Sequence, residues 1–284
     1  MGCNPTPLSL SLDSALRPFL ASRSPSVIQS RHKPHALRFL KLVRRASSPS
    51  PFLSNGPAPG TFLDPEALHS LDALRLFRRG IELDLTGDGG GGFLEIRPME
   101  AGELEATAQL LAESFAESMF VPLRYVYVLT FLVKQYIEER VALEPHVAVL
   151  LGFYREAGAE GEPQLAATAE ISFDARGANA APPTPVPPRE CPYICNMAVK
   201  KTLRRRRIGW HLLKACEELI TQMKAQRRVY LHCRVIDKIP FQMYQKAGYN
   251  VIKTDSFLSW FTLQRRKHLM CKELPPCTDV IGSP

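Results

Sequence analysis

The chain has 284 residues, which is enough for one good-sized domain with an extension or for two small domains. It contains no run of 18 or more apolar residues, so the sequence predicts no membrane-spanning helix. Its seven cysteines form no CxxC pair, a pattern that argues against a zinc site and indicates thiols in a reducing compartment. We therefore expect no bound metal.

The formal charge of +8 is unevenly distributed along the chain. Residues 1–63 carry eight Lys and Arg residues and a single acid, Asp13. Residues 191–284 hold 18 basic and 6 acidic residues, whereas residues 64–190 are strongly acidic. A basic half beside an acidic half indicates that the basic half binds an anionic ligand, such as a phosphorylated cofactor or a nucleic acid.

Residues 1–63 have the composition of a leader and not of a folded domain. They are rich in Ser, Arg and Pro and nearly free of acids, which is typical of an organellar transit peptide. A competing interpretation is lipidation, because Gly2 and Thr6 fit a myristoylation pattern and Cys3 is a candidate for palmitoylation.

Residues 64–92 follow as a short helix, expected over 64–79, and a glycine-rich linker over 87–92. We expect the folded domain to occupy residues 93–284. Strands are predicted at 93–98, 146–154, 165–173, 193–199, 228–235, 249–252 and 263–274. Helices are predicted at 101–118, 123–141, 207–224 and 240–247. The order β-α-α-β-β-β-α-β-α-β-β predicts an α/β fold with a mixed, mostly antiparallel sheet flanked by helices.

The segment from Tyr193 to Gly209 has the clearest chemical content. A strand, Tyr193–Val199, is followed by a turn containing four consecutive arginines, Arg204 to Arg207, and then by an amphipathic helix. The first amides of a helix lack internal partners and carry partial positive charge, so such a turn predicts a pyrophosphate site. Taken alone, the arginines are equally consistent with a solvated basic patch.

A second segment, Asp237 to Tyr249, favours the pyrophosphate site over the solvated basic patch. Together the two segments resemble the GNAT acetyltransferases, whose motifs are Arg/Gln-x-x-Gly-x-Gly/Ala and Asn-x-x-Ala-x-x-Leu-Tyr-x-Lys-x-Gly-Phe. Arg204 and Gly209 match the ends of the first motif, and Tyr244 matches the tyrosine of the second. Arg207 stands where the family has its first glycine, a departure that an arginine with helical dihedral angles would accommodate.

The resemblance implies an acetyl-CoA-dependent N-acetyltransferase and assigns roles to individual residues. Tyr244 would protonate the departing CoA thiolate. The residues that would bind acetyl-CoA are Met197, Ala198, Val199, Arg204, Arg205, Arg206, Arg207, Ile208, Gly209, Asp237, Lys238, Ile239 and Tyr244 itself.

Two further residues are candidates for handling the proton of the acceptor amine. The run Val229-Tyr230-Leu231-His232 resembles a strand of N-terminal acetyltransferases in which the histidine acts through water. Tyr193 matches a tyrosine at the start of their cofactor strand. Glu170, on a predicted strand, is an alternative base.

Within the family, the leader and the sequence Tyr-Ile-Cys-Asn-Met-Ala-Val resemble the plant plastid branch, which implies a stromal enzyme that acetylates protein lysines and N-termini. An α-amine titrates near pH 8 and the lysine side chain near pH 10.4. Acetylation of lysine therefore depends more strongly on a general base, or on desolvation, to give the neutral amine. The residues do not choose between these acceptors or exclude a small arylalkylamine. A non-catalytic module binding CoA or nucleic acid through residues 204–207 and 265–267 is also open. The scarcity of aromatic residues beside these basic runs argues against nucleic acid.

The leader generates a first testable prediction. We expect a fluorescent reporter fused to residues 1–63 to enter plastids and the mature protein to lack about the first 46 to 63 residues, because basic, acid-poor leaders are read as import signals. Microscopy and N-terminal sequencing check this. A cytosolic reporter contradicts the prediction, and a membrane signal that is lost in Gly2→Ala would support lipidation instead.

Overall fold

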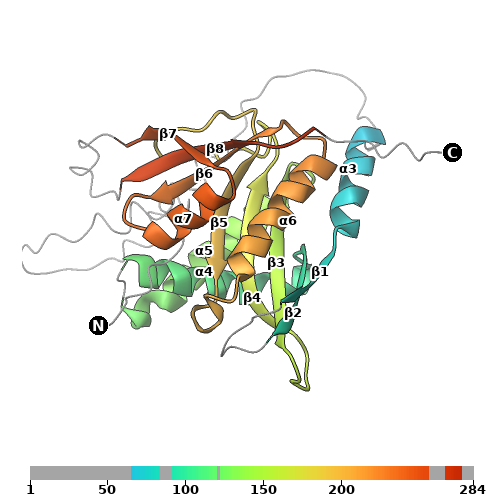
Figure 1. Ribbon diagram of the computed structural model, residues 1–284, viewed down its shortest axis with the longest axis vertical. Coiled ribbons are helices and arrows are strands. Elements are labelled where there is room, and N and C mark those ends of the chain that lie inside the picture. Colours follow the sequence, from blue (N-terminus) through green and yellow to red (C-terminus); the bar gives the residue numbers. More distant parts are fainter. Residues whose placement is uncertain (1–64, 84–90, 120–121, 256–265, 277–284) are drawn as a thin grey trace, which may run out of the picture.

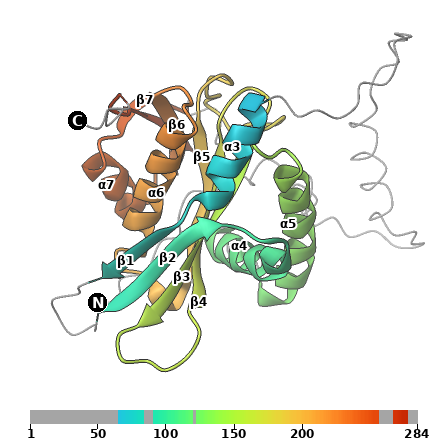
Figure 2. The ribbon, with the colours of Figure 1, turned by 90° about the vertical axis from the view of Figure 1, so that its right-hand side faces the viewer.

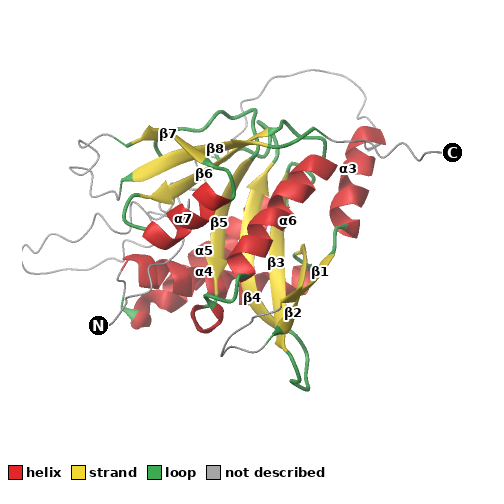
Figure 3. Ribbon diagram, in the orientation of Figure 1, coloured by secondary structure: helices red, strands yellow, loops and turns green. Residues whose placement is uncertain are grey.

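The computed structural model describes residues 65–83, 91–119, 122–255 and 266–276. The chain forms three layers, with one sheet between two layers of helices (Figures 1 and 3). The expected leader, most of the glycine run and Arg265 lie outside the described residues. None of the helices in the described ranges is long and apolar enough to cross a membrane.

The sheet has eight strands in the order β1-β2-β3-β4-β5-β6-β8-β7. All neighbours are antiparallel except β5 and β6, which are parallel. The strands are β1 (Arg79–Leu83), β2 (Gly92–Pro98), β3 (Val147–Glu156), β4 (Gln164–Ser172), β5 (Tyr193–Val199), β6 (Arg228–Arg234), β7 (Asn250–Thr254) and β8 (Lys267–Glu273). The predicted mixed, mostly antiparallel α/β architecture is confirmed.

Helices cover both faces of the sheet. Figure 2 shows α4 and α5 on one side and α6 and α7 on the other, with α3 beside α6. The helices are α3 (Pro65–Leu76), α4 (Leu104–Met119), α5 (Val126–Val141), α6 (Ile208–Gln222) and α7 (Lys238–Lys246), with short 3-10 turns at Ala101–Glu103, Leu123–Tyr125 and Lys201–Leu203. The apolar stripe of α6 buries Ile208, Leu212, Cys216 and Leu219 against the sheet, as a spacing of three and four residues requires.

The sequence did not predict strand β1. It pairs antiparallel with β2, and its Leu83 joins Leu74 and Phe77 of the preceding segment in the larger hydrophobic core. Five residues with only two apolar side chains, Ile81 and Leu83, give too weak an alternation to be recognised before a glycine run. We therefore propose that the folded domain includes residues 65–83 and does not begin at residue 93.

The parallel pair β5–β6 is the irregular part of the sheet. The two strands pair only at Tyr193↔Tyr230 and Ile194↔Leu231. On its other side, β5 contains one extra residue, because Glu170 pairs with Cys195 whereas Thr168 pairs with Ala198. This bulge bends the second half of β5, so the two strands diverge beyond their first residues.

Candidate active site

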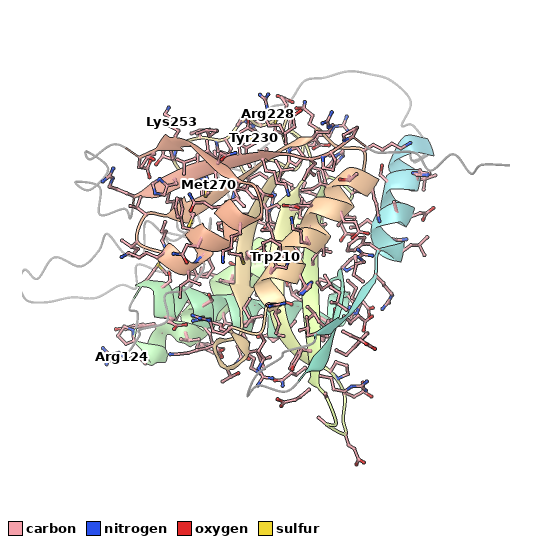
Figure 4. The ribbon with its side chains drawn as sticks, viewed as in Figure 1. Arg124, Trp210, Arg228, Tyr230, Lys253 and Met270 are labelled. Atoms are coloured by element: carbon pink, nitrogen blue, oxygen red, sulfur yellow. The ribbon has the colours of Figure 1, made fainter. Side chains whose placement is uncertain are left out.

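Within the described sheet, the divergence leaves residues 197–199 of β5 without a ladder partner on β6. Tyr230 marks the paired end of the strands, and Trp210, in the first turn of α6, lies well below it in Figure 4. Helix α6 therefore begins near the open end of the gap. A Cβ atom on Gly209 would lie 3.4 Å from Val199 and 3.7 Å from Met243, so α6, β5 and α7 meet here.

The four arginines of the turn after β5 divide into two pairs. Arg204 donates from Nε to the Val199 carbonyl (3.1 Å) and from both Nη atoms to the carboxylate of Glu117 on α4 (3.2 and 2.8 Å). Arg206 donates from Nη1 to the Tyr154 hydroxyl and to Glu156, both at 2.9 Å. The hydrogen bonds of these two guanidinium groups connect the turn to α4 and β3.

Arg205 and Arg207 are exposed, and their side chains make no hydrogen bond or ion pair with another described residue. Both have left-handed backbones, with φ of 70° and 59°. Arg207 therefore does not have the helical dihedral angles that would accommodate an arginine here, because its backbone lies in the region that glycine adopts without strain. The glycine of the family motif satisfies a backbone requirement that Arg207 meets at a cost.

The turn between β6 and α7 ends at Asp237, and Lys238 and Ile239 are the first residues of α7. The carboxylate of Asp237 is completely buried and accepts a hydrogen bond of 2.7 Å from Nε of Arg234. Lys238 and Ile239 are exposed. The Asp237 side chain therefore stabilises the turn from within, and the exposed residues are the ones that can contact a ligand.

Tyr244 points from α7 into the larger core, where its side chain is 2% exposed. Its hydroxyl lies 3.8 Å from the sulfur of Met197 on β5, and its ring packs edge-on against Tyr249 with centroids 6.1 Å apart. Burial raises the pKa of the Tyr244 phenol well above its ordinary value, with smaller contributions from Cys233 and Asp237. The phenol therefore keeps its proton at neutral pH.

The structure brings Tyr193 and His232 together on the other face of the sheet. The Tyr193 hydroxyl lies 2.8 Å from Nδ1 of His232, and the Pro185 carbonyl lies 2.8 Å from Nε2. A carbonyl can only accept, so Nε2 carries the proton, and in the neutral ring Nδ1 accepts from Tyr193. Burial, followed by repulsion from Lys267, lowers the pKa of His232 to about 3. His232 is thus a neutral, weakly basic side chain.

Glu170 lies at the β5 bulge and is 3% exposed. Its carboxylate accepts hydrogen bonds from Tyr136 and Arg140 of α5 and from Asn196 of β5. The sequence named Glu170 but not its three partners. A polar Asn among apolar strand residues was the available signal for Asn196, whereas Tyr136 and Arg140 are ordinary helix residues until the fold places them.

Comparison with known proteins agrees with this arrangement. Residues 123–249 match the Acetyltransferase (GNAT) family. The chain is 50% identical over 237 residues to GCN5-related N-acetyltransferase 5, chloroplastic, of Arabidopsis thaliana, covering 81% of this chain and 72% of that protein. The chain belongs to the GNAT acetyltransferase family. It is an acyltransferase of the acetyl-CoA-dependent N-acetyltransferase type, and acetyl-CoA is its cosubstrate.

Solved structures show more distant likeness to this GNAT protein. One is a protein from Bacillus halodurans, 12% identical with a TM-score of 0.48, which covers 70% of this chain and 91% of its own. Another is the GNAT-family acetyltransferase from Streptococcus pneumoniae, 16% identical with a TM-score of 0.44, at 64% and 99% coverage. At such scores and identities, neither structure bears on substrate or catalytic residues.

The left-handed backbone at Arg207 predicts a gain in stability. We expect Arg207→Gly to raise the free energy of unfolding by about 0.5–1 kcal/mol. Removing Cβ relieves the strain of a left-handed backbone in the folded state, and this gain exceeds the loss from the greater conformational entropy of glycine in the unfolded chain. Urea denaturation measures the change. Arg207→Ala is the matched control, since it removes the charge but keeps Cβ. Equal gains in both variants would instead identify repulsion among the arginines as the cause.

The buried His232 predicts a pH dependence of stability. Its pKa is about 3 when folded against 6.5 ordinarily, so the unfolded chain binds more protons between those values. The stabilisation from neutral His232 is complete above pH 6.5 and declines as the pH falls. We expect His232→Gln to reduce the loss of stability between pH 7 and pH 5 by about 2 kcal/mol. The exposed His69, changed to Gln, is the control. An unchanged pH slope in His232→Gln would contradict a buried neutral ring.

Proposed function

We propose that this protein transfers the acetyl group of acetyl-CoA to protein amines, N-terminal α-amines and lysine ε-amines, in the plastid stroma. The location is supported by the chloroplastic relative at 50% identity and by the basic, acid-poor leader. The single observation that carries the chemistry is the gap between β5 and β6, with the start of α6 at its open end and the Tyr244 phenol beside Met197.

The residues at this gap fit acetyl-CoA. The unpaired main-chain edge of Met197, Ala198 and Val199 can hydrogen-bond an extended pantetheine arm, and the first amides of α6, from Ile208 and Gly209, suit a pyrophosphate. Acetyl-CoA supplies an acetyl group activated as a thioester. Exposed Arg205 and Arg207 would add positive charge, and Lys238 and Ile239 would border the ligand. Arg204, Arg206 and Asp237 would act indirectly by holding the two turns.

Tyr244 is the proposed proton donor to the leaving thiolate. It keeps its proton at neutral pH, and its hydroxyl lies beside the β5 residues proposed to bind the cosubstrate. Its ring is fixed by packing in the core, so the hydroxyl has a defined position. A rigid, protonated phenol at the end of the gap meets the requirements of a general acid.

The properties of His232 favour α-amines over lysine as acceptors. With a pKa of about 3, the Tyr193–His232 pair can orient a proton through its hydrogen bonds but is a poor base near neutral pH. About half of α-amines are already neutral near pH 8, against about one lysine in a few hundred. We propose that N-terminal α-amines react readily and that lysines react more slowly, where desolvation lowers their pKa.

Incubation of the full chain with labelled acetyl-CoA and a proteome-derived peptide library tests this function. Mass spectrometry would locate the acetyl groups, and we expect them mainly on peptide N-termini, with fewer on lysines. Exclusive modification of a small amine added in competition, such as an arylalkylamine, would contradict a protein acceptor. Modification of lysines alone would contradict the proposed preference.

The role of Tyr244 predicts a defect in turnover. We expect Tyr244→Phe to lower kcat about 10²-fold, within the usual span for a positioned acid, with little change in acetyl-CoA affinity or stability because the ring remains. Tyr249→Phe is the matched control, since it removes another buried phenol from the same core. Steady-state kinetics and calorimetry separate the effects. Undiminished turnover in folded Tyr244→Phe would remove Tyr244 from the mechanism, and an equal loss of rate and affinity would make it a ligand contact.

A further inference from the structure

A buried polar cluster connects α5, β4 and β5 directly beside the bulge. Arg140 donates from Nε to Oε1 of Glu170 at 2.7 Å, and the Tyr136 hydroxyl donates to Oε2 at 2.9 Å. Asn196 donates from Nδ2 to the same Oε2 at 2.6 Å. Arg140, Glu170 and Asn196 are 7%, 3% and 1% exposed. Nδ2 of Asn196 also lies 3.2 Å from the Tyr136 hydroxyl, so the cluster is closed.

Asn196 is the residue at which β5 departs from regular strand geometry. Its φ of 49° is left-handed, and it lies within the segment where β5 has one residue more than β4. Asparagine tolerates a left-handed backbone better than most residues, but the conformation remains unfavourable unless another interaction compensates for it. The 2.6 Å hydrogen bond to Glu170 offsets that cost and holds the bulge in place.

The carboxylate of Glu170 is engaged by its hydrogen-bond partners and is not available to accept a proton. Removing a carboxylate from water is costly unless it is paired and hydrogen-bonded, and here Arg140 supplies the charge while two neutral donors complete the set. Arg140 is itself fixed at a second point by donating to the Gly177 carbonyl. A carboxylate with these partners is poorly suited to receive a proton from an amine.

We infer that Glu170 and Asn196 are positioning residues for the cosubstrate. Through Asn196, Glu170 sets the bulge of β5, and the bulge turns the main chain of Met197 away from β6 so that its edge can bind the pantetheine arm of acetyl-CoA. Arg140 and Tyr136 anchor this cluster to α5. The inference rests on the proposed binding edge of β5, and it gives Glu170 a role other than that of a base.

A charge-conserving exchange tests the inference. In Glu170→Gln alone, an amide NH2 replaces one oxygen and faces either Arg140 or Asn196, both of which are donors, so the hydrogen bonds that hold the bulge are weakened. The double variant Glu170→Gln/Asn196→Asp restores a carboxylate, the total charge and a reciprocal hydrogen bond. We expect the single variant to raise the Kd and the KM for acetyl-CoA about tenfold, with unchanged KM for an acceptor peptide and an unchanged pH profile of kcat. We expect the double variant to recover most of the affinity.

Glu217→Gln is the matched control. Glu217 is another buried glutamate, and it pairs with Lys214 of α6 and Lys272 of β8, outside the cluster of Glu170. It should lower stability without changing the Kd for acetyl-CoA. An equal rise in Kd in this control would show that the effect is general destabilisation and would overturn the inference.

Two other outcomes overturn the inference. If kcat collapses in Glu170→Gln with an unchanged Kd, an altered pH profile and no recovery in the double variant, Glu170 is a base. If neither Kd nor kcat changes, the cluster has no role in the site. Because the Kd is measured calorimetrically without an acceptor, failure of the wild-type chain to acetylate protein amines would contradict the proposed function and leave this test intact.

Discussion

The separation of β5 from β6 is the constraint on which the rest of the molecule depends. Each of these parallel strands is held along its other edge by an antiparallel neighbour, β4 or β8, and the pair itself meets at only two positions. An extra residue in β5 therefore lets its second half diverge from β6 while it stays paired with β4. Among the described residues, the result is a main-chain edge at residues 197–199 with no ladder partner on β6, next to the start of α6. Main-chain groups are costly to leave buried and unsatisfied, so such an edge suits an extended ligand.

Ion pairs maintain this opening from three directions. The pair between Arg204 and Glu117 ties the turn after β5 to α4, Arg140 and Glu170 tie the bulge to α5, and Arg234 and Asp237 fix the turn before α7. The last two pairs are almost fully buried, so each stabilises only as long as both partners remain. The acidic segment 64–190 and the basic segment 191–284 meet in the first of these pairs, that of Glu117 with Arg204.

The sequence predicted the order of elements and the two segments that meet at the gap, because both depend on local signals: an amphipathic stripe on α6, a basic turn, and a proline and a glycine around α7. It did not predict β1, whose place depends on pairing with β2. It also could not sort the arginines. Four identical side chains in a row read as one basic patch, whereas their partners Glu117, Tyr154 and Glu156 come from strands and helices at least 50 residues away. The left-handed backbone of Arg207 was likewise invisible, since the sequence shows an arginine there.

The two sets of residues proposed to handle protons lie on opposite faces of the sheet because of strand alternation. Tyr193 and Ile194 are adjacent in β5 and point to opposite sides, so Ile194 shares the core of Tyr244 whereas Tyr193 shares a smaller cluster with Tyr230. In the proposed mechanism, the donor to the leaving group and the relay for the incoming amine therefore lie on opposite faces of β5. The low basicity of His232 follows from its burial and from repulsion by Lys267, whereas the hydrogen bond to the Pro185 carbonyl acts in the opposite direction and raises its pKa. Pro185 is one of several buried prolines in the segment between β4 and β5. The Pro185 carbonyl fixes the tautomer of His232, and in the proposed mechanism the low pKa of the ring favours acceptor amines that are already neutral near physiological pH.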